Sequence, residues 1–157
     1  MIALELLAGW LIADLLSGLG HWIGDSYLLE RLGLEELFAG ANVDHHARPL
    51  DIVHQGVLKR NATAWAGTVL FVSLWLLLLS PSWVLAGAAA GGLIVSEVHR
   101  WAHSPSRAPR AVRWLQKTGL LQSPRHHAAH HRPPHSVRFC LLTNWLNLAL
   151  DSLRRLR

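Results

Sequence analysis

Long stretches without charge alternate with polar, histidine-rich stretches along this chain. Residues 2–19 are apolar apart from two acids and a serine, and they are long enough to cross a bilayer as a helix. Residues 62–96 contain no charged residue, and Pro81 divides them into two arms of about 17 residues, near the lower limit for a crossing. The pattern predicts a membrane helix followed by a helical hairpin. We expect the first helix to stay attached, because it has neither a basic leader nor a convincing cleavage site.

A fourth apolar stretch, residues 139–150, is too short for a comfortable crossing and precedes several arginines. We therefore expect a partial or interfacial helix there. Small residues at 87–92 in the second hairpin arm would let neighbouring helices approach closely. The fold class that follows is all-α, an integral membrane bundle of about four membrane helices in a single domain, residues 1–157.

Composition supports a membrane protein. Hydrophobic residues make up 51% of the chain and charged residues only 16%, and eight tryptophans favour the boundary between membrane and water. The net charge of +5 fits anionic lipid headgroups better than nucleic acid once the apolar stretches are considered, so we expect no nucleic-acid partner. A single cysteine, Cys140, excludes an internal disulfide and a cysteine-rich zinc site. Any metal must then be bound through nitrogen and oxygen.

Two polar stretches, residues 21–61 and 97–138, flank the predicted hairpin and therefore lie on the same side of the membrane. Both carry Arg or Lys, whereas the hairpin turn at residues 80–82 carries neither. The positive-inside rule places both stretches in the cytoplasm as a histidine-rich cap. Within them, residues 104–113 contain two prolines and are predicted to form a basic loop.

Eleven histidines occur, and all of them lie in these polar stretches. A spacing of four residues puts two imidazoles on one helix face, which applies to 99 with 103, 126 with 130, and 127 with 131. Two prolines at 133 and 134 should end the last of these helices and redirect the residue that follows. Ten histidines are therefore expected to converge at the cytoplasmic surface: His21, His45, His46, His99, His103, His126, His127, His130, His131 and His135. His54 is expected to be a cap or a solvated side chain.

Ten imidazoles suffice for two metal ions, whereas a zinc site needs only three or four ligands. Imidazole binds iron, copper, nickel and zinc alike, so the ligand type leaves the metal open. Taken alone, the last histidine cluster could also be a pH-sensitive or loosely metal-binding tract. That interpretation does not account for three histidine groups separated by apolar stretches.

The histidine motifs, in this order, resemble the lipid desaturase domain family. The segments that carry the resemblance are ADLLSGLGHWIGD at 13–25, DHHARP at 44–49, EVHRWAH at 97–103, SPRHHAAHHRPPH at 123–135 and TNWLNLALD at 143–151. Lys59 stands where an acidic side chain is expected, and Asn144 replaces a glycine. These departures leave the histidines intact and put the identity of the substrate in doubt.

The resemblance implies a membrane di-iron desaturase that uses O2 and an external electron donor of the cytochrome b5 or ferredoxin type. Its substrate would be an acyl or alkyl chain of a membrane phospholipid, the latter giving a vinyl ether. The ligands that the resemblance implies are His21, His45, His46, His99, His103, His126, His127 and His130, with His131, His135 and Asn61 as further metal contacts. The acids Asp14, Asp25 and Glu97 would hold the outer ring nitrogens of the ligands.

Two other functions stay open at this point. A lipid or alkane hydroxylase would use the same di-iron chemistry, and a membrane metal-handling protein would bind metal without catalysis. Arg100, Arg107, Arg110 and Arg113 could hold a phospholipid headgroup, or they could be ordinary loop charges on the inner face. A homo-oligomer could complete the lipid-binding groove of so short a chain.

Overall fold

A computed structural model describes residues 1–25, 33 and 44–152, which are mostly helical and contain no strand. Residues 26–32 and 34–43 of the first polar stretch lie outside the described part. The helices are α1 (Ile2–Gly24), α4 (Asp51–His54), α5 (Val57–Leu78), α6 (Trp83–His103), α7 (Arg110–Thr118), α8 (Pro124–His130) and α9 (Asn147–Ser152), with a 3-10 turn η1 at Pro105–Arg107. The all-α prediction is confirmed for these ranges.

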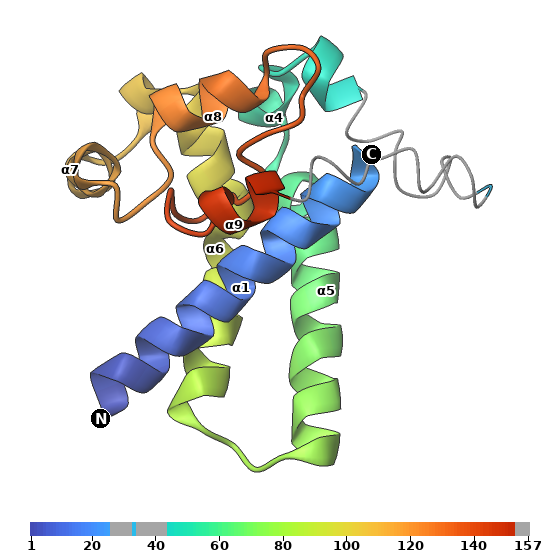
Figure 1. The fold of residues 1–157 in the computed structure, drawn as a ribbon, viewed down its shortest axis with the longest axis vertical. Coiled ribbons are helices and arrows are strands. Elements are labelled where there is room, and N and C mark those ends of the chain that lie inside the picture. The colour runs from blue at the N-terminus through green and yellow to red at the C-terminus, as the bar shows by residue number, and fades with distance from the viewer. Residues whose placement is uncertain (26–32, 34–43, 153–157) are drawn as a thin grey trace.

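Three long helices, α1, α5 and α6, form a shaft that carries the shorter helices at one end (Figure 1). The N-terminus and the turn between α5 and α6 lie at the opposite end (Figure 1). The described parts of both polar stretches therefore lie at one end, as predicted from the hairpin. Helices α1 and α5 are long and apolar enough to cross a membrane. Most residues of α5 are exposed and the rest are half-buried, apart from Asn61, which is buried.

The hairpin breaks where Pro81 predicted it. The hydroxyl of Ser82 accepts a hydrogen bond from the amide of Leu85 at 3.2 Å and caps the start of α6. The helices nevertheless extend beyond the apolar stretches: α1 continues to Gly24, α5 begins already at Val57, and α6 continues to His103. Each long helix thus runs without interruption from the apolar shaft into the histidine-rich end.

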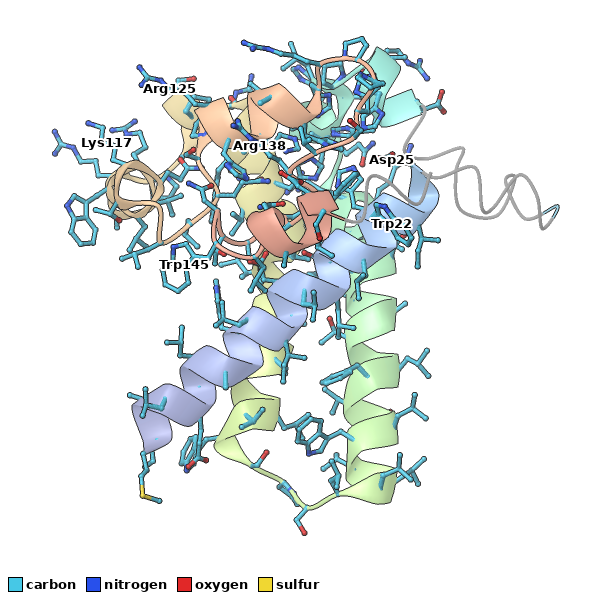
Figure 2. The ribbon with its side chains drawn as sticks, in the orientation of Figure 1. Trp22, Asp25, Lys117, Arg125, Arg138 and Trp145 are labelled. Atoms are coloured by element: carbon cyan, nitrogen blue, oxygen red, sulfur yellow. The ribbon has the colours of Figure 1, made fainter. Side chains whose placement is uncertain are left out.

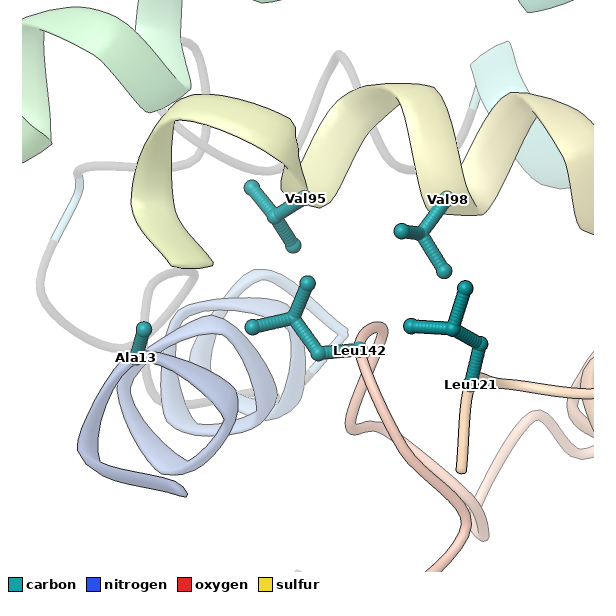
Figure 3. Packing of buried hydrophobic residues seen from close by; sticks show 5 residues of the cluster. All are labelled: Ala13, Val95, Val98, Leu121 and Leu142. Carbon is teal, nitrogen blue, oxygen red and sulfur yellow. The ribbon is translucent and has the colours of Figure 1, made fainter. Parts of the chain in front are cut away.

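Small residues allow α1 and α6 to cross at close range, as predicted for the second hairpin arm. A Cβ atom at Gly9 would overlap the carbonyl oxygen of Val84, and one at Gly87 would overlap that of Leu6. Beyond this crossing, Ala13, Val95, Val98, Leu121 and Leu142 form the main hydrophobic cluster. Figure 3 shows Leu142 inserted between α1 and α6 in this cluster.

The predicted helix over residues 139–150 is wrong for its first part. Residues 139–146 are not helical, and helix α9 covers only Asn147–Ser152. The reason is that side chains, in place of helical carbonyls, accept the backbone N–H groups of this segment. Asp14 accepts from the amides of Leu142 and Thr143 at 2.8 and 3.2 Å, and Asn147 accepts from that of Cys140 at 2.8 Å. The segment is thereby held in the core against α1.

The expected basic loop at residues 104–113 also differs from the structure. It contains η1 and the first turn of α7. Helix α7 is capped at its C-terminal end by Gly119, which has the left-handed conformation (φ 77°). Prolines act here as helix starts: Pro105 occupies the first turn of η1, and Pro109 precedes α7.

Candidate metal centre

The histidine-rich end contains two groups of side chains whose ligand atoms lie within 4.8 Å of one another. We call the first the five-histidine cluster; it consists of His45, His99, His103, His127 and His131. We call the second the mixed cluster; it consists of His21, Asp25, His46 and His130. Nine of the predicted site residues are thus brought into two adjacent groups.

Helix spacing builds much of the five-histidine cluster. Positions 99 and 103 project from the C-terminal end of α6, and positions 127 and 131 from α8 and its C-cap. The remaining member, His45, comes from a short helical stretch at residues 44–47. Its Nε2 atom lies 3.1 Å from that of His103.

The contacts inside this cluster cannot all be hydrogen bonds. The Nε2 atoms of His99, His103 and His127 form a triangle with sides of 2.9, 3.1 and 2.7 Å. A neutral imidazole nitrogen is either a donor or an acceptor, so three mutual neighbours always include one pair of the same kind. A cation that receives all three lone pairs removes this conflict. The donor set of the five-histidine cluster therefore fits a metal ion.

Electrostatics keep these imidazoles neutral. Burial, reinforced by the neighbouring histidines, lowers the pKa of His45 to about 2 and that of His103 to about 3. The pKa of His131 falls to about 4, chiefly through burial. Neutral imidazoles offer lone pairs, and a metal ion requires deprotonated ligands. The site is therefore ready to bind a cation at neutral pH.

The mixed cluster lies at the end of α1. His21 and Asp25 are one helical turn apart, and the Nε2 atom of His130 lies 3.0 Å from that of His21 and 2.9 Å from that of His46. A carboxylate oxygen of Asp25 is 3.4 Å from His130 Nε2. On the other side of its ring, His130 Nδ1 donates to the carbonyl oxygen of Val137 at 2.8 Å. That hydrogen bond protonates Nδ1 and leaves the Nε2 lone pair directed into the cluster.

The two clusters share their chain segments. Adjacent residues serve different clusters: His45 joins the five-histidine cluster and His46 the mixed cluster, with ring centroids 6.1 Å apart. On α8, His127 and His130 are divided in the same way, with centroids 5.8 Å apart. The geometry therefore provides two neighbouring cation positions that α8 and the 44–47 stretch hold in common.

Three predicted metal contacts lie outside both clusters. His126 Nε2 is buried without a hydrogen-bond partner, and burial lowers the pKa of its imidazole to about 4. His135 stacks on His46 with ring centroids 4.1 Å apart and donates from Nδ1 to the His130 carbonyl at 3.1 Å. Asn61 donates to Val57 O at 2.9 Å and to Glu97 at 3.1 Å. His54, expected as a cap or surface residue, ends α4 and is exposed.

The three acids that were expected to hold histidine ring nitrogens lie in different surroundings. Asp25 lies among the ligand atoms themselves. Asp14 binds the C-terminal segment, accepting from the Thr143 hydroxyl at 2.5 Å in addition to the two amides. Glu97 accepts from Arg60 Nε at 2.7 Å and from Arg100 Nε at 2.8 Å, and these arginines with Asn61 are its partners in place of a histidine.

Two contributions to the site were not predicted from the sequence. The Val137 carbonyl that orients His130 is a backbone group, which no residue pattern reveals. The pairing of Arg60 with Glu97 joins the start of α5 to the end of α6. Both residues border the uncharged stretch 62–96, and their opposite charges at the two ends of a hairpin were an available signal.

Comparisons with known proteins found one matching family and several relatives. A family model described as the lipid desaturase domain matches residues 10–157. The chain is similar to plasmanylethanolamine desaturase of Myxococcus xanthus, with 29% identity over 152 residues that cover 92% of this chain and 54% of the relative. It is also similar to fatty acid desaturase 4-like 2, chloroplastic, of Arabidopsis thaliana (35% identity; 92% of this chain and 53% of the relative). A third relative is plasmanylethanolamine desaturase 1 of Mus musculus (27% identity; 96% and 60%). The chain spans about half the length of the first two relatives. No solved structure matches it.

Proposed function

The chain belongs to the lipid desaturase domain family, and on that premise we propose that it is a membrane di-iron enzyme that uses O2 to desaturate a phospholipid chain. The observation that carries the proposal is the pair of adjacent clusters, one of five histidines and one of three histidines with Asp25, at the end of an apolar helical shaft. A single structural zinc ion would need only three or four of these ligands.

Each cluster would hold one iron ion through its Nε2 atoms, and Asp25 would add a carboxylate to the mixed cluster. A pair of iron ions, when bound, supplies with O2 an oxidant strong enough to remove hydrogen from an unactivated C–C unit, which zinc does not. Asp25 is the one carboxylate in either cluster, so it would offset part of the cationic charge on its side. The two positions are therefore expected to be chemically different.

The residues around the clusters would fix the ligands in place. The Val137 carbonyl sets the tautomer of His130, and the buried ring of Phe139 lies 5.5 Å from the His130 ring and 6.3 Å from that of His21. Phe139 thus covers the mixed cluster on the side of the C-terminal segment and excludes water there. His135 is proposed to steady His46 through its stacked ring.

The substrate is proposed to approach from the lipid side. We infer that α1 and α5 cross the membrane and that the acyl or alkyl chain of a phospholipid reaches the clusters from the apolar shaft. The positive-inside rule places the histidine-rich end in the cytoplasm, where an electron-transfer protein of the cytochrome b5 or ferredoxin type would supply electrons. The product is an unsaturated acyl chain or a vinyl ether.

Lipid analysis tests the proposal. Membranes are compared from cells expressing the wild-type chain, His103→Ala, or His54→Ala as a control that removes an exposed histidine outside both clusters. We expect a new unsaturated or vinyl-ether lipid in the wild type and in His54→Ala, and its loss in His103→Ala. A hydroxylated lipid in its place would identify a hydroxylase. Identical lipids in all three strains, with zinc bound, would contradict the proposal and favour a metal-handling protein.

A further inference from the structure

Positive charge predominates in the second polar stretch at the histidine-rich end. Between Val98 and Leu150 the chain contains eight Arg and Lys residues and no Asp or Glu. One of these cations, Arg100, is neutralised by the carboxylate of Glu97 at 2.8 Å. Arg110, Arg113 and Lys117 on α7 have no carboxylate partner within the described part of the chain. An anionic partner therefore fits this surface.

Helix α7 has two faces of opposite character. Val112 and Leu115 pack against the main hydrophobic cluster, and Gln116 beside them is buried. The other face presents Arg110, Arg113, Trp114 and Lys117, which recur at the spacing of one helix face. Trp114 is 60% exposed in the middle of these cations. The helix is thus fixed to the protein by one face and offers a basic, aromatic face outward.

A second tryptophan extends this face toward the shaft. Trp145 is 44% exposed. Figure 2 shows Lys117 and Trp145 on the same side of the molecule, with Trp145 nearer to the apolar part of the long helices. Along the long axis, the order is therefore apolar shaft, tryptophan, cation. That order matches the hydrocarbon, the interface and the headgroups of a bilayer.

We propose that the outward face of α7, with Trp145, lies on the membrane interface and binds anionic phospholipid. Arg and Lys near a membrane surface are attracted to anionic headgroups. The indole rings occupy the layer between headgroups and acyl chains, where their apolar body and their N–H group are both satisfied. Exposed tryptophans among the cations favour a lipid over an acidic protein as the occupant. The proposal rests on the membrane placement of the shaft and is independent of the reaction.

Headgroup-specific quenching measures this contact. The full chain is placed in phosphatidylcholine nanodiscs that contain a minor share of brominated phosphatidylglycerol or of brominated phosphatidylcholine. Bromine quenches nearby tryptophan, and the difference between the wild type and Trp114→Phe isolates the contribution of Trp114. We expect stronger quenching of Trp114 by the anionic lipid than by the neutral one. Each cation near the surface is worth about a fivefold preference, so the three together should give a clear excess.

Charge variants assign the preference to α7. The quenching ratio is the quenching of Trp114 by the brominated anionic lipid divided by its quenching by the brominated neutral lipid. The triple change Arg110→Gln, Arg113→Gln and Lys117→Gln should reduce this ratio nearly to one. The matched triple change of the exposed residues Lys59→Gln, Arg125→Gln and Arg132→Gln removes the same charge elsewhere and should leave the ratio unchanged. A ratio of one in the wild type would overturn the proposal. So would an unquenched Trp114 in a chain whose other tryptophans are quenched, which would leave an acidic protein as the occupant.

Discussion

Substitutions of Asp14 test how strongly this residue holds the segment 139–146 against α1. Its carboxylate is fully buried and accepts hydrogen bonds from Leu142 N at 2.8 Å, Thr143 N at 3.2 Å and the Thr143 hydroxyl at 2.5 Å. In Asp14→Ala, two buried amides lose their acceptor, at about 1–3 kcal/mol each, or roughly 4 kcal/mol together. In Asp14→Asn, the amide oxygen can still accept from both backbone groups, and the loss of charge assistance costs about 2 kcal/mol.

The assay is thermal unfolding of the purified full chain in detergent, followed by tryptophan fluorescence. For a chain of this size, 1 kcal/mol corresponds to roughly 2–4 °C in Tm. We therefore expect Tm to fall by about 8–16 °C in Asp14→Ala and by about 4–8 °C in Asp14→Asn. Glu5→Gln is the control, because it replaces a carboxylate by an amide, as Asp14→Asn does, near the exposed start of α1. It should leave Tm unchanged.

A second readout connects this segment to the site. The segment that Asp14 holds begins next to Val137, whose carbonyl orients His130. Metal binding to the mixed cluster should therefore weaken in Asp14→Ala more than in Asp14→Asn. If both variants unfold and bind metal like Glu5→Gln, the hydrogen bonds of Asp14 contribute nothing to holding the segment.

Three further predictions concern packing, charge and pH. Gly9→Ala should lower Tm markedly because its methyl group overlaps the α6 backbone, whereas Gly67→Ala, with open space around it, should raise Tm slightly; thermal unfolding compares the pair. Glu97→Gln should destabilise the chain by about 1–3 kcal/mol, since buried Arg60 loses its carboxylate, and the same assay measures the shift. After metal removal, the free energy of unfolding should be constant above about pH 6.5 and fall as the pH drops toward 3. In the folded chain the pKa values of His45 and His103 are about 2 and 3. Below about pH 6.5 these two histidines therefore bind protons in the unfolded chain but not in the folded chain. The same Tm for the chelator-treated chain at about pH 7.5 and at about pH 5 would contradict this loss of stability at low pH.

The long helices were predictable because their apolar stretches are continuous and Pro81 is a strong break. The ends of these helices were not predictable, because charged residues at the ends have partners that lie far away in the sequence. Arg60 and Glu97 lie inside helices since each satisfies the other across the hairpin. The non-helical segment 139–146 was missed for the same reason. The acceptor that takes its amides out of helical bonding, Asp14, lies 128 residues from Leu142 in the sequence.

The candidate site was predictable as a set of residues and not as an arrangement. The i, i+4 rule paired His99 with His103 and His127 with His131, and both pairs lie in the five-histidine cluster. The same rule paired His126 with His130, yet His126 lies outside both clusters. A spacing rule gives the face of one helix and says nothing about which other helix that face meets. The division of His45 and His46 between the clusters depends on that tertiary arrangement.

The metal content of the purified chain shows whether the two clusters are two separate metal positions. The chain is loaded with ferrous iron under anaerobic conditions, desalted and analysed by elemental mass spectrometry beside variants that disable one cluster each. We expect two iron ions per wild-type chain. We expect about one in the double variant His99→Ala and His103→Ala, and about one in His130→Ala. A wild-type chain that holds a single ion, or the same content in all three proteins, would contradict two separate positions.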